Sequence, residues 1–281
     1  MRCMTPAPTR HLPHPDRLSV LTAVIVLAYA LTRVLALPSR AIHTTLFGSE
    51  LGFDLNGQVL MLVLVAALIS AGSDTLVRSH PRLAGQPGRS TAIHWILPGA
   101  SALVLGAVLN RLPDGLLWWL GLAASAVVLL LVLIAEYVTV DRDDPSWDLA
   151  ALGLTALAYG LALVLFALLR SASARAVISA TIAGLVAGGL TLRLLALKAV
   201  PIGRAVLYAF VVGVISAEAI WALGYWRITA SSAGLLAMIP FYLAVGLAQQ
   251  HLAGQLNRRI WIEYAIIGAL GLTIALIYAF V

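Results

Sequence analysis

Nine apolar segments of spanning length divide this sequence, and they constrain its fold more than any other feature. Because about 20 consecutive apolar residues in an α-helix cross the hydrocarbon core of a bilayer, each segment is long enough to span it. Charged residues make up only 11% of the chain, against about 25% in soluble domains. We therefore predict an all-α fold, a polytopic transmembrane bundle of about nine helices. The segments fall at 18–37, 55–77, 92–111, 115–138, 148–170, 174–197, 203–225, 229–250 and 259–280.

The first 17 residues, rich in Pro, His and Arg, are predicted to form a disordered cytoplasmic N-terminus, followed by a single transmembrane domain over 18–281. The first apolar segment is too long for the core of a signal peptide, so we expect it to be retained as a helix. Cys3 is the only cysteine, which excludes an intrachain disulfide and a multi-cysteine metal site.

Basic residues set the expected orientation. If the N-terminus is cytoplasmic, most of the 18 lysine and arginine residues fall on the inner side of the membrane, as the positive-inside rule requires. This predicts a multi-pass protein of the cell (cytoplasmic) membrane with its C-terminus outside. The same rule, with contact to anionic lipid, accounts for the net charge of +6, so we expect no nucleic-acid partner.

The loop between the first two helices carries a strand pattern. Apolar residues alternate on both sides of Gly48-Ser49, and Gly at the first turn position suits a two-residue hairpin. We predict a short extracytoplasmic β-hairpin over 42–55, serving as a lid or spacer. A ligand-binding role for its polar residues is the alternative. The predicted cross-strand pairs are Ile42–Leu55, Thr44–Phe53 and Leu46–Leu51, and the polar residues are His43, Glu50 and Asp54.

Charged residues point to an internal repeat. Arg111 and Glu136 reappear as Arg193 and Glu218 at one offset, since 193 − 111 = 82 and 218 − 136 = 82. The repeated units, 92–170 and 174–250, would each hold three helices. An odd number of helices inverts the second unit in the membrane, a common construction in secondary transporters. In a chain so rich in Leu, Ala, Val and Gly, chance identities are the alternative.

The repeat predicts two ion pairs inside the membrane. Arg111 would meet Glu218 in the outer half, and Arg193 would meet Glu136 in the inner half. Charges in this setting are costly and are usually paired. Three interpretations remain open: the pairs fix the bundle, one of them lines a solute or proton path, or each side chain extends to its own interface.

A second group of polar residues gathers at the predicted inner face. Carboxylates and histidines together can bind a divalent ion or transfer protons. The spacing is unspecific, however: it lacks the Gly and distal Glu of a calcium-binding loop. Asp144 followed by Pro145 is typical of a helix start, and Asp74 with Arg78 is an i, i+4 pair. We predict no metal, no cofactor and no catalytic residue. The group consists of Asp74, Arg78, His80, His94, Asp141, Asp143 and Asp144.

Several short segments resemble an uncharacterised family of bacterial polytopic membrane proteins, a domain of unknown function. The resemblance covers nearly the whole chain and implies a bacterial membrane protein. It implies no activity, so no functional residue can be assigned from it. The segments are Asp74-Thr75-Leu76-Val77-Arg78-Ser79-His80-Pro81, His94-Trp95, Asn110-Arg111-Leu112-Pro113, Ala135-Glu136-Tyr137 and Asp141 with Asp143-Asp144-Pro145.

Three function classes follow from the sequence. The first is a transporter or channel-like protein for a small solute or lipid, which a polar cavity at Glu136 or Glu218 would favour. The second is a non-catalytic scaffold or assembly factor of a membrane complex, which a packed bundle would favour. The third, an intramembrane enzyme with a cytoplasmic-face acidic and histidine site, is the least favoured. The expected partners are the bilayer and either other membrane subunits or further copies of the chain.

Overall fold

The computed structural model describes residues 13–34, 40–46, 49–55, 57–83, 90–172, 175–198 and 200–280. The chain divides into two compact units, Met1–Ser146 and Trp147–Val281, and each is described by itself. Whether the two units form the single domain predicted over 18–281 depends on how they are joined, so that prediction stays a prediction. Most of the N-terminal segment predicted to be disordered lies outside the described residues.

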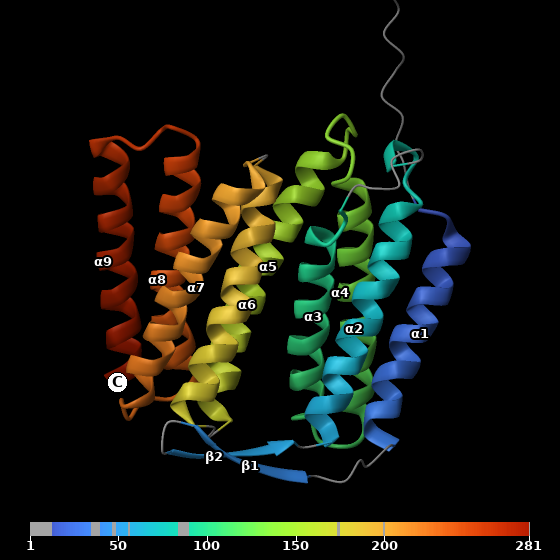
Figure 1. Cartoon of the computed structure of the whole chain (residues 1–281), viewed down its shortest axis with the longest axis horizontal. Helices are drawn as coiled ribbons and strands as arrows, with labels where there is room; N and C mark the ends of the chain where they lie inside the picture. Colours follow the sequence, from blue (N-terminus) through green and yellow to red (C-terminus); the bar gives the residue numbers. More distant parts are fainter. Residues whose placement is uncertain are drawn as a thin grey trace, which may run out of the picture. The chain divides into compact units, whose positions relative to one another are not determined.

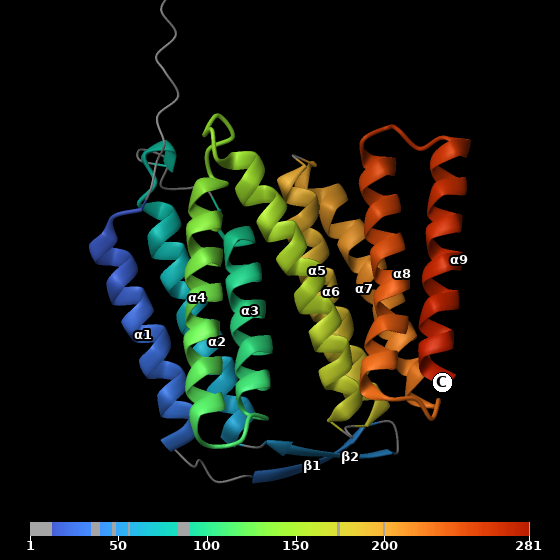
Figure 2. The same ribbon diagram turned by 180° about the vertical axis from the view of Figure 1, so that it is seen from behind.

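Unit 1 is a group of four helices with one pair of strands (Figures 1 and 2). The helix α2 packs against α3, α3 contacts α4, and α1 contacts both α2 and α4. The successive helices run antiparallel (Figure 1) and share one core. The elements are α1 (Pro15–Val34), β1 (Arg40–Leu46), β2 (Ser49–Leu55), α2 (Gly57–Arg78), the short 3-10 helix η1 (Pro81–Leu83), α3 (Ile93–Leu109) and α4 (Leu116–Val138).

The core of unit 1 joins α1 to the other three helices. Tyr29 of α1 is almost fully buried, and its hydroxyl donates a hydrogen bond of 2.8 Å to the carbonyl of Ala102 in α3. At the last turn of α1, Arg33 forms an ion pair with Asp114 in the turn before α4. Gly115 follows with a φ of 118°, a conformation that favours glycine. The connection from α3 to α4 therefore ends in a turn at Asp114 and Gly115.

The strands β1 and β2 pair antiparallel in the segment where the sequence predicted a hairpin. The predicted register was wrong by two residues: Ile42 lies opposite Phe53 rather than Leu55, and Thr44 lies opposite Leu51. Ser49, predicted as a turn residue, belongs to β2 and pairs with Leu46. The residues between the strands lie outside the described part of the chain.

Unit 2 holds five helices. The closest pair is α6 with α7; α5 packs against α8, and α8 also contacts α7 and α9. Only 6% of the residues in the spanning segment of α9 are buried, so most of this helix is exposed or half-buried. The helices are α5 (Trp147–Ser171), α6 (Ala176–Leu197), α7 (Ile202–Gly224), α8 (Ala230–Leu252) and α9 (Arg258–Phe280).

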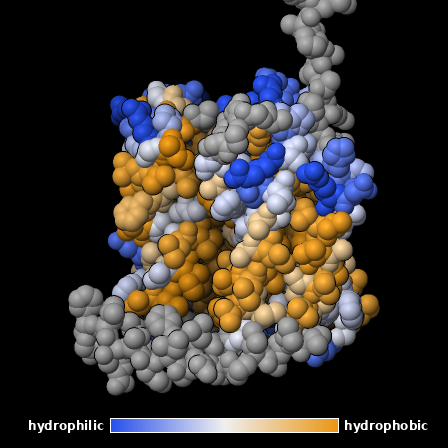
Figure 3. Space-filling model, turned by 45° about the vertical axis from the view of Figure 1, so that its right-hand side comes forward, coloured by the Kyte–Doolittle hydropathy of each residue, from blue (hydrophilic) through white to orange (hydrophobic). Residues whose placement is uncertain are grey.

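Eight of the nine helices in the described residues are long and apolar enough to cross a membrane, judged by length and composition. The ninth, α3, has 17 residues and is about 26 Å long, a little short of the about 30 Å hydrocarbon core. Figure 3 shows hydrophobic side chains over the middle of the visible face. The chain is a multi-pass membrane protein. Both ends of each helix lie within three residues of their predicted positions. The largest difference is α1, which begins at Pro15 rather than 18.

The predicted orientation can be tested by labelling single cysteines from outside the cell, in a chain that lacks Cys3. We expect cysteine at Ser49 and Ser173 to react with a membrane-impermeant maleimide, and cysteine at Ser79 and Asp143 to be protected. Ser173 lies outside the described residues, and Ser49 is in β2. Labelling at Ser79 and Asp143 with protection at Ser49 would show that the orientation is reversed.

Candidate functional site

The end of unit 1 where α2 and α4 end and α3 begins gathers most of its polar side chains. We call it the polar end of unit 1, and it consists of residues 74–83, 91–95 and 136–146. Antiparallel packing explains the gathering, because the end of one helix lies beside the start of the next. Two serines of α2 hold the start of α3 in place: Ser73 donates to the carbonyl of His94 at 3.1 Å, and Ser70 donates to that of Trp95 at 3.3 Å.

Glu136 and His94 form the most deeply placed polar contact of this end. The Oε2 of Glu136 in α4 lies 2.7 Å from the Nδ1 of His94 in α3, a hydrogen-bonding distance. The Glu136 side chain is fully buried, whereas that of His94 is 20% exposed. A buried carboxylate therefore connects through one imidazole to the surface of the unit. Sequence reasoning named both residues but did not predict that they meet.

Asp74 is surrounded by hydrogen-bond donors. Its Oδ2 accepts from Arg78 one helical turn away at 2.7 Å, as the i, i+4 spacing predicted. Its Oδ1 accepts from the Trp95 indole at 3.0 Å and from the hydroxyl of Thr91. These contacts tie the last turn of α2 to the start of α3, so the geometry gives Asp74 a structural role.

Arg82 connects η1 to the loop that follows α4. Its guanidinium donates to Asp141 at 2.9 Å and also to Asp143. Burial by itself raises the pKa of Asp141. The hydrogen bonds from the backbone N–H of Asp143 and from the Arg82 guanidinium lower it by more than burial raises it, so the pKa is below its usual value. The two carboxylates raise the pKa of Arg82. Arg82 was absent from the predicted polar group, because nothing in its local sequence marks these partners.

His80 and Asp144 complete the polar end. His80 is fully buried; its Nδ1 accepts the backbone N–H of Arg82 at 3.1 Å, and its ring packs 4.7 Å from that of Tyr137. Asp144 accepts the backbone N–H of Ser146 at 2.7 Å, immediately before α5 begins. The two hydrogen bonds to backbone N–H groups stabilise the turns at residues 80–82 and 144–146.

The seven predicted polar residues thus divide into separate contacts instead of one centre. Asp74 and Arg78 form one, His94 joins Glu136 in a second, and Asp141 and Asp143 share Arg82 in a third. Across the described ranges, no three His, Cys, Asp or Glu side chains lie close enough to hold a metal ion together. The chemistry that this end supports is proton exchange through His94 and Glu136.

The four residues of the predicted ion pairs differ in burial. Arg111 and Glu218 are exposed, whereas Glu136 and Arg193 are buried, Arg193 at 3% exposure. Each predicted pair joins one residue of unit 1 to one residue of unit 2, so both pairs stay predictions. The offset of 82 also aligns Gly106 with Gly188, but these glycines have different neighbours. Gly106 faces the side chains of Leu62 and Tyr29, and Gly188 faces the backbone of α7.

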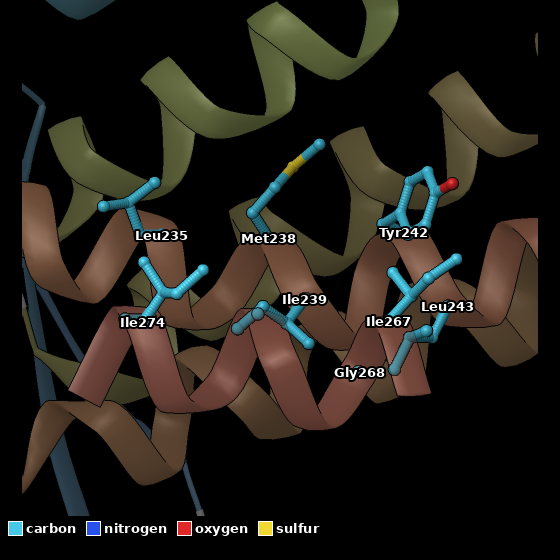
Figure 4. Close-up of a pocket in the computed structure, with 10 residues that line it drawn as sticks. Leu235, Met238, Ile239, Tyr242, Leu243, Ile267, Gly268 and Ile274 are labelled. Carbon is cyan, nitrogen blue, oxygen red and sulfur yellow. The ribbon is translucent and has the colours of Figure 1, made fainter. Parts of the chain in front are cut away.

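Unit 2 has an apolar groove of about 310 Å³ between α8 and α9. Leu235 and Ile239 of α8 and Ile267 and Ile274 of α9 line it, and the phenol of Tyr242 is its polar group (Figure 4). The composition of this groove suits the hydrocarbon chain of a lipid.

Acid should weaken the contact between Arg82 and Asp141. Because the pKa of Asp141 is lowered in the folded state, its contribution to stability is present above the usual carboxyl pKa of about 4 and is lost as the pH falls through the folded value. We expect Arg82→Gln to lower Tm by a few degrees at pH 7, and the difference from wild type to shrink below about pH 4. Thermal unfolding in detergent across this pH range measures it. Arg258→Gln, at the exposed start of α9, is the charge-matched control. A difference that is constant with pH would contradict the role of Asp141.

One family model matches most of this sequence. It is described as "Protein of unknown function (DUF5656)", and it covers residues 37–278. The match confirms the predicted resemblance to an uncharacterised family. No curated protein and no solved structure matches the sequence.

Proposed function

The chain belongs to the DUF5656 family, and from this premise we propose that it is a transporter that moves a small solute or a lipid across the membrane. We place it in the bacterial cytoplasmic membrane with its N-terminus inside, as the distribution of basic residues indicates. In that orientation the polar end of unit 1 faces the cytoplasm. Transport in this proposal depends on His94 and Glu136.

The observation that carries the proposal is the contact between His94 and Glu136. Ionisable residues within membrane helices are costly, and they mark substrate paths and proton relays. Glu136 is fully buried in α4 and lies 2.7 Å from His94, which is partly exposed. A proton taken up by the imidazole from water can pass along this hydrogen bond to the carboxylate and return. Histidine suits this exchange, because each ring nitrogen can either donate or accept a hydrogen bond.

Proton movement driven by a solute tests this proposal. The full chain is reconstituted in liposomes that contain a pH-sensitive dye, and amino acids, sugars, organic acids and short-chain lipids are added in turn. We expect at least one class to move protons, and Glu136→Gln to abolish the signal. Glu263→Gln is the matched control, because Glu263 is exposed and bonded to Arg259 in the first turn of α9. A response that Glu136→Gln leaves intact, or no response to any class, would contradict the proposal.

A scaffold or assembly factor is the second candidate. It is supported by α9, whose spanning segment is 6% buried and packs mainly against α8. Another subunit or a second copy of the chain would find a long apolar face there. Cysteines on that face of α9 would form cross-links to such a partner in membranes. If the face contacts only lipid, the chain would stay monomeric after cross-linking.

An intramembrane enzyme is the third candidate and the weakest. Asp74, Asp141 and Asp143 each hold an arginine that fixes a helix end or a loop. These carboxylates are engaged in structural contacts, so they give little support to an enzyme.

A further inference from the structure

A pocket of about 440 Å³ lies within unit 2, where α5 begins and where α6 and α8 end. Its polar lining includes Asp148 and Thr155 of α5, Lys198 after α6 and Gln249 of α8. Its apolar lining includes Leu152, Ala156 and Leu194. The pocket is separate from the polar end of unit 1, and neither the repeat nor the proposed transport accounts for it.

The two charged residues of this pocket have opposite signs and are available to a ligand. Asp148 and Lys198 are both exposed. Within the described ranges, neither side chain makes a hydrogen bond or an ion pair. They therefore offer an acceptor for a cation and a donor for an anion at the mouth of one pocket. A ligand that carries both charges can satisfy the two at once.

The pocket changes from polar to apolar along α5. Leu152 and Ala156 lie four and eight residues after Asp148, which places them about 6 and about 12 Å deeper along the helix. Leu152 is 67% exposed. The hydroxyl of Thr155, beside Ala156, donates to the carbonyl of Ala151 within α5. A ligand bound here would meet charges at the end of the helices and hydrocarbon further in. This order matches a phospholipid better than it matches a water-soluble solute.

We propose that this pocket binds a phospholipid with a phosphoethanolamine headgroup. Its ammonium group donates to the carboxylate of Asp148, and its phosphate accepts from the ammonium of Lys198. The amide of Gln249 is available to the ester groups, and an acyl chain follows Leu152 and Ala156. A phosphocholine lipid lacks the N–H donors for Asp148, and a phosphatidylglycerol lacks the cation. The pocket should therefore distinguish among the three.

Native mass spectrometry of the full chain in detergent tests this selectivity. We expect phosphatidylethanolamine to bind at least about tenfold more tightly than phosphatidylcholine or phosphatidylglycerol, since one charge-assisted hydrogen bond is worth a factor of this size. Lys198→Gln and Asp148→Asn should each lower the affinity for phosphatidylethanolamine by about tenfold. Lys198→Arg should retain it. Arg258→Gln, which removes a charge from the exposed start of α9, should leave it unchanged.

Circular dichroism first establishes that each variant is helical; if Asp148→Asn does not fold, the comparison of Lys198→Gln with Lys198→Arg carries the test. Equal affinity for the three lipids would overturn the proposal, and so would an equal loss in Arg258→Gln. Glycerophosphoethanolamine, which has the headgroup but no acyl chains, tests the source of the headgroup. If it displaced bound phosphatidylethanolamine as effectively as the free lipid does, the ligand would be a soluble zwitterion and not a lipid. These outcomes concern unit 2 alone, so they are independent of the proton measurements on Glu136.

Discussion

Removal of the Glu136 carboxylate should be among the most destabilising single changes in unit 1. Glu136→Ala deletes a fully buried acceptor 2.7 Å from His94 and leaves that imidazole without it. Breaking a buried charged contact by removing one side costs roughly 3–5 kcal/mol, because the remaining charge or donor is held in a low-dielectric setting. We expect a fall in Tm of many degrees in detergent, measured by thermal unfolding. Glu263→Ala is the control, and exposed pairs of its kind are worth about 1 kcal/mol or less.

The same variant tests the predicted contact between Glu136 and Arg193. If the two residues meet, Arg193→Ala destabilises the protein by itself, and the double variant recovers much of the loss, because both charges are then gone. A double-mutant cycle on Tm measures this coupling. The cycle of Arg111→Ala with Glu218→Ala examines the mirrored pair, whose residues are both exposed, and we expect a smaller coupling there. Additive effects in both cycles would remove the main support for the repeat.

The helices could be predicted closely from the sequence, whereas the register of the strands could not. Each spanning helix is marked by a long apolar segment with Pro, Gly or charge at its ends, so Leu116–Val138 differs from its prediction by one residue. A hairpin register that moves by two residues keeps every side chain on the same face. The alternation of apolar residues therefore fits two registers equally well. In the predicted register Ile42 pairs with Leu55, and in the observed register it pairs with Phe53.

The polar end of unit 1 was predictable as a set of residues and only partly as a set of contacts. The bond between Asp74 and Arg78 is local, one helical turn, and the spacing predicted it. His94 and Glu136 are 42 residues apart, and Arg82 is 59 residues from Asp141. These contacts depend on which helices are neighbours and how each is rotated, and a single sequence does not specify either. The antiparallel order of α3 and α4 could have indicated that the start of one lies beside the end of the other.

The packing of α6 on α7 depends on glycine at three positions. A Cβ atom built on Gly213 would lie 2.7 Å from the carbonyl oxygen of Gly184, and one on Gly188 would lie 3.1 Å from that of Ala209. These neighbours are backbone atoms, so they cannot move aside as the end of a flexible side chain can. Small residues let membrane helices approach this closely, and the attraction between such helices comes from packing.

A larger side chain at Gly213 should therefore separate α6 from α7. We expect Gly213→Leu to lower the free energy of unfolding by about 3 kcal/mol or more, the upper part of the range for overpacked sites, and Gly213→Ala to have a smaller effect in the same direction. Gly203→Ala is the matched control, because Gly203 lies in the same helix and its Cβ position has no atom within 4 Å apart from its own local backbone. It should leave stability unchanged or slightly higher, since alanine is the better helix former. Thermal unfolding of the three variants in detergent measures their order of stability. If Gly213→Leu unfolded at the wild-type temperature, the close approach of the two backbones would not contribute to the stability of unit 2.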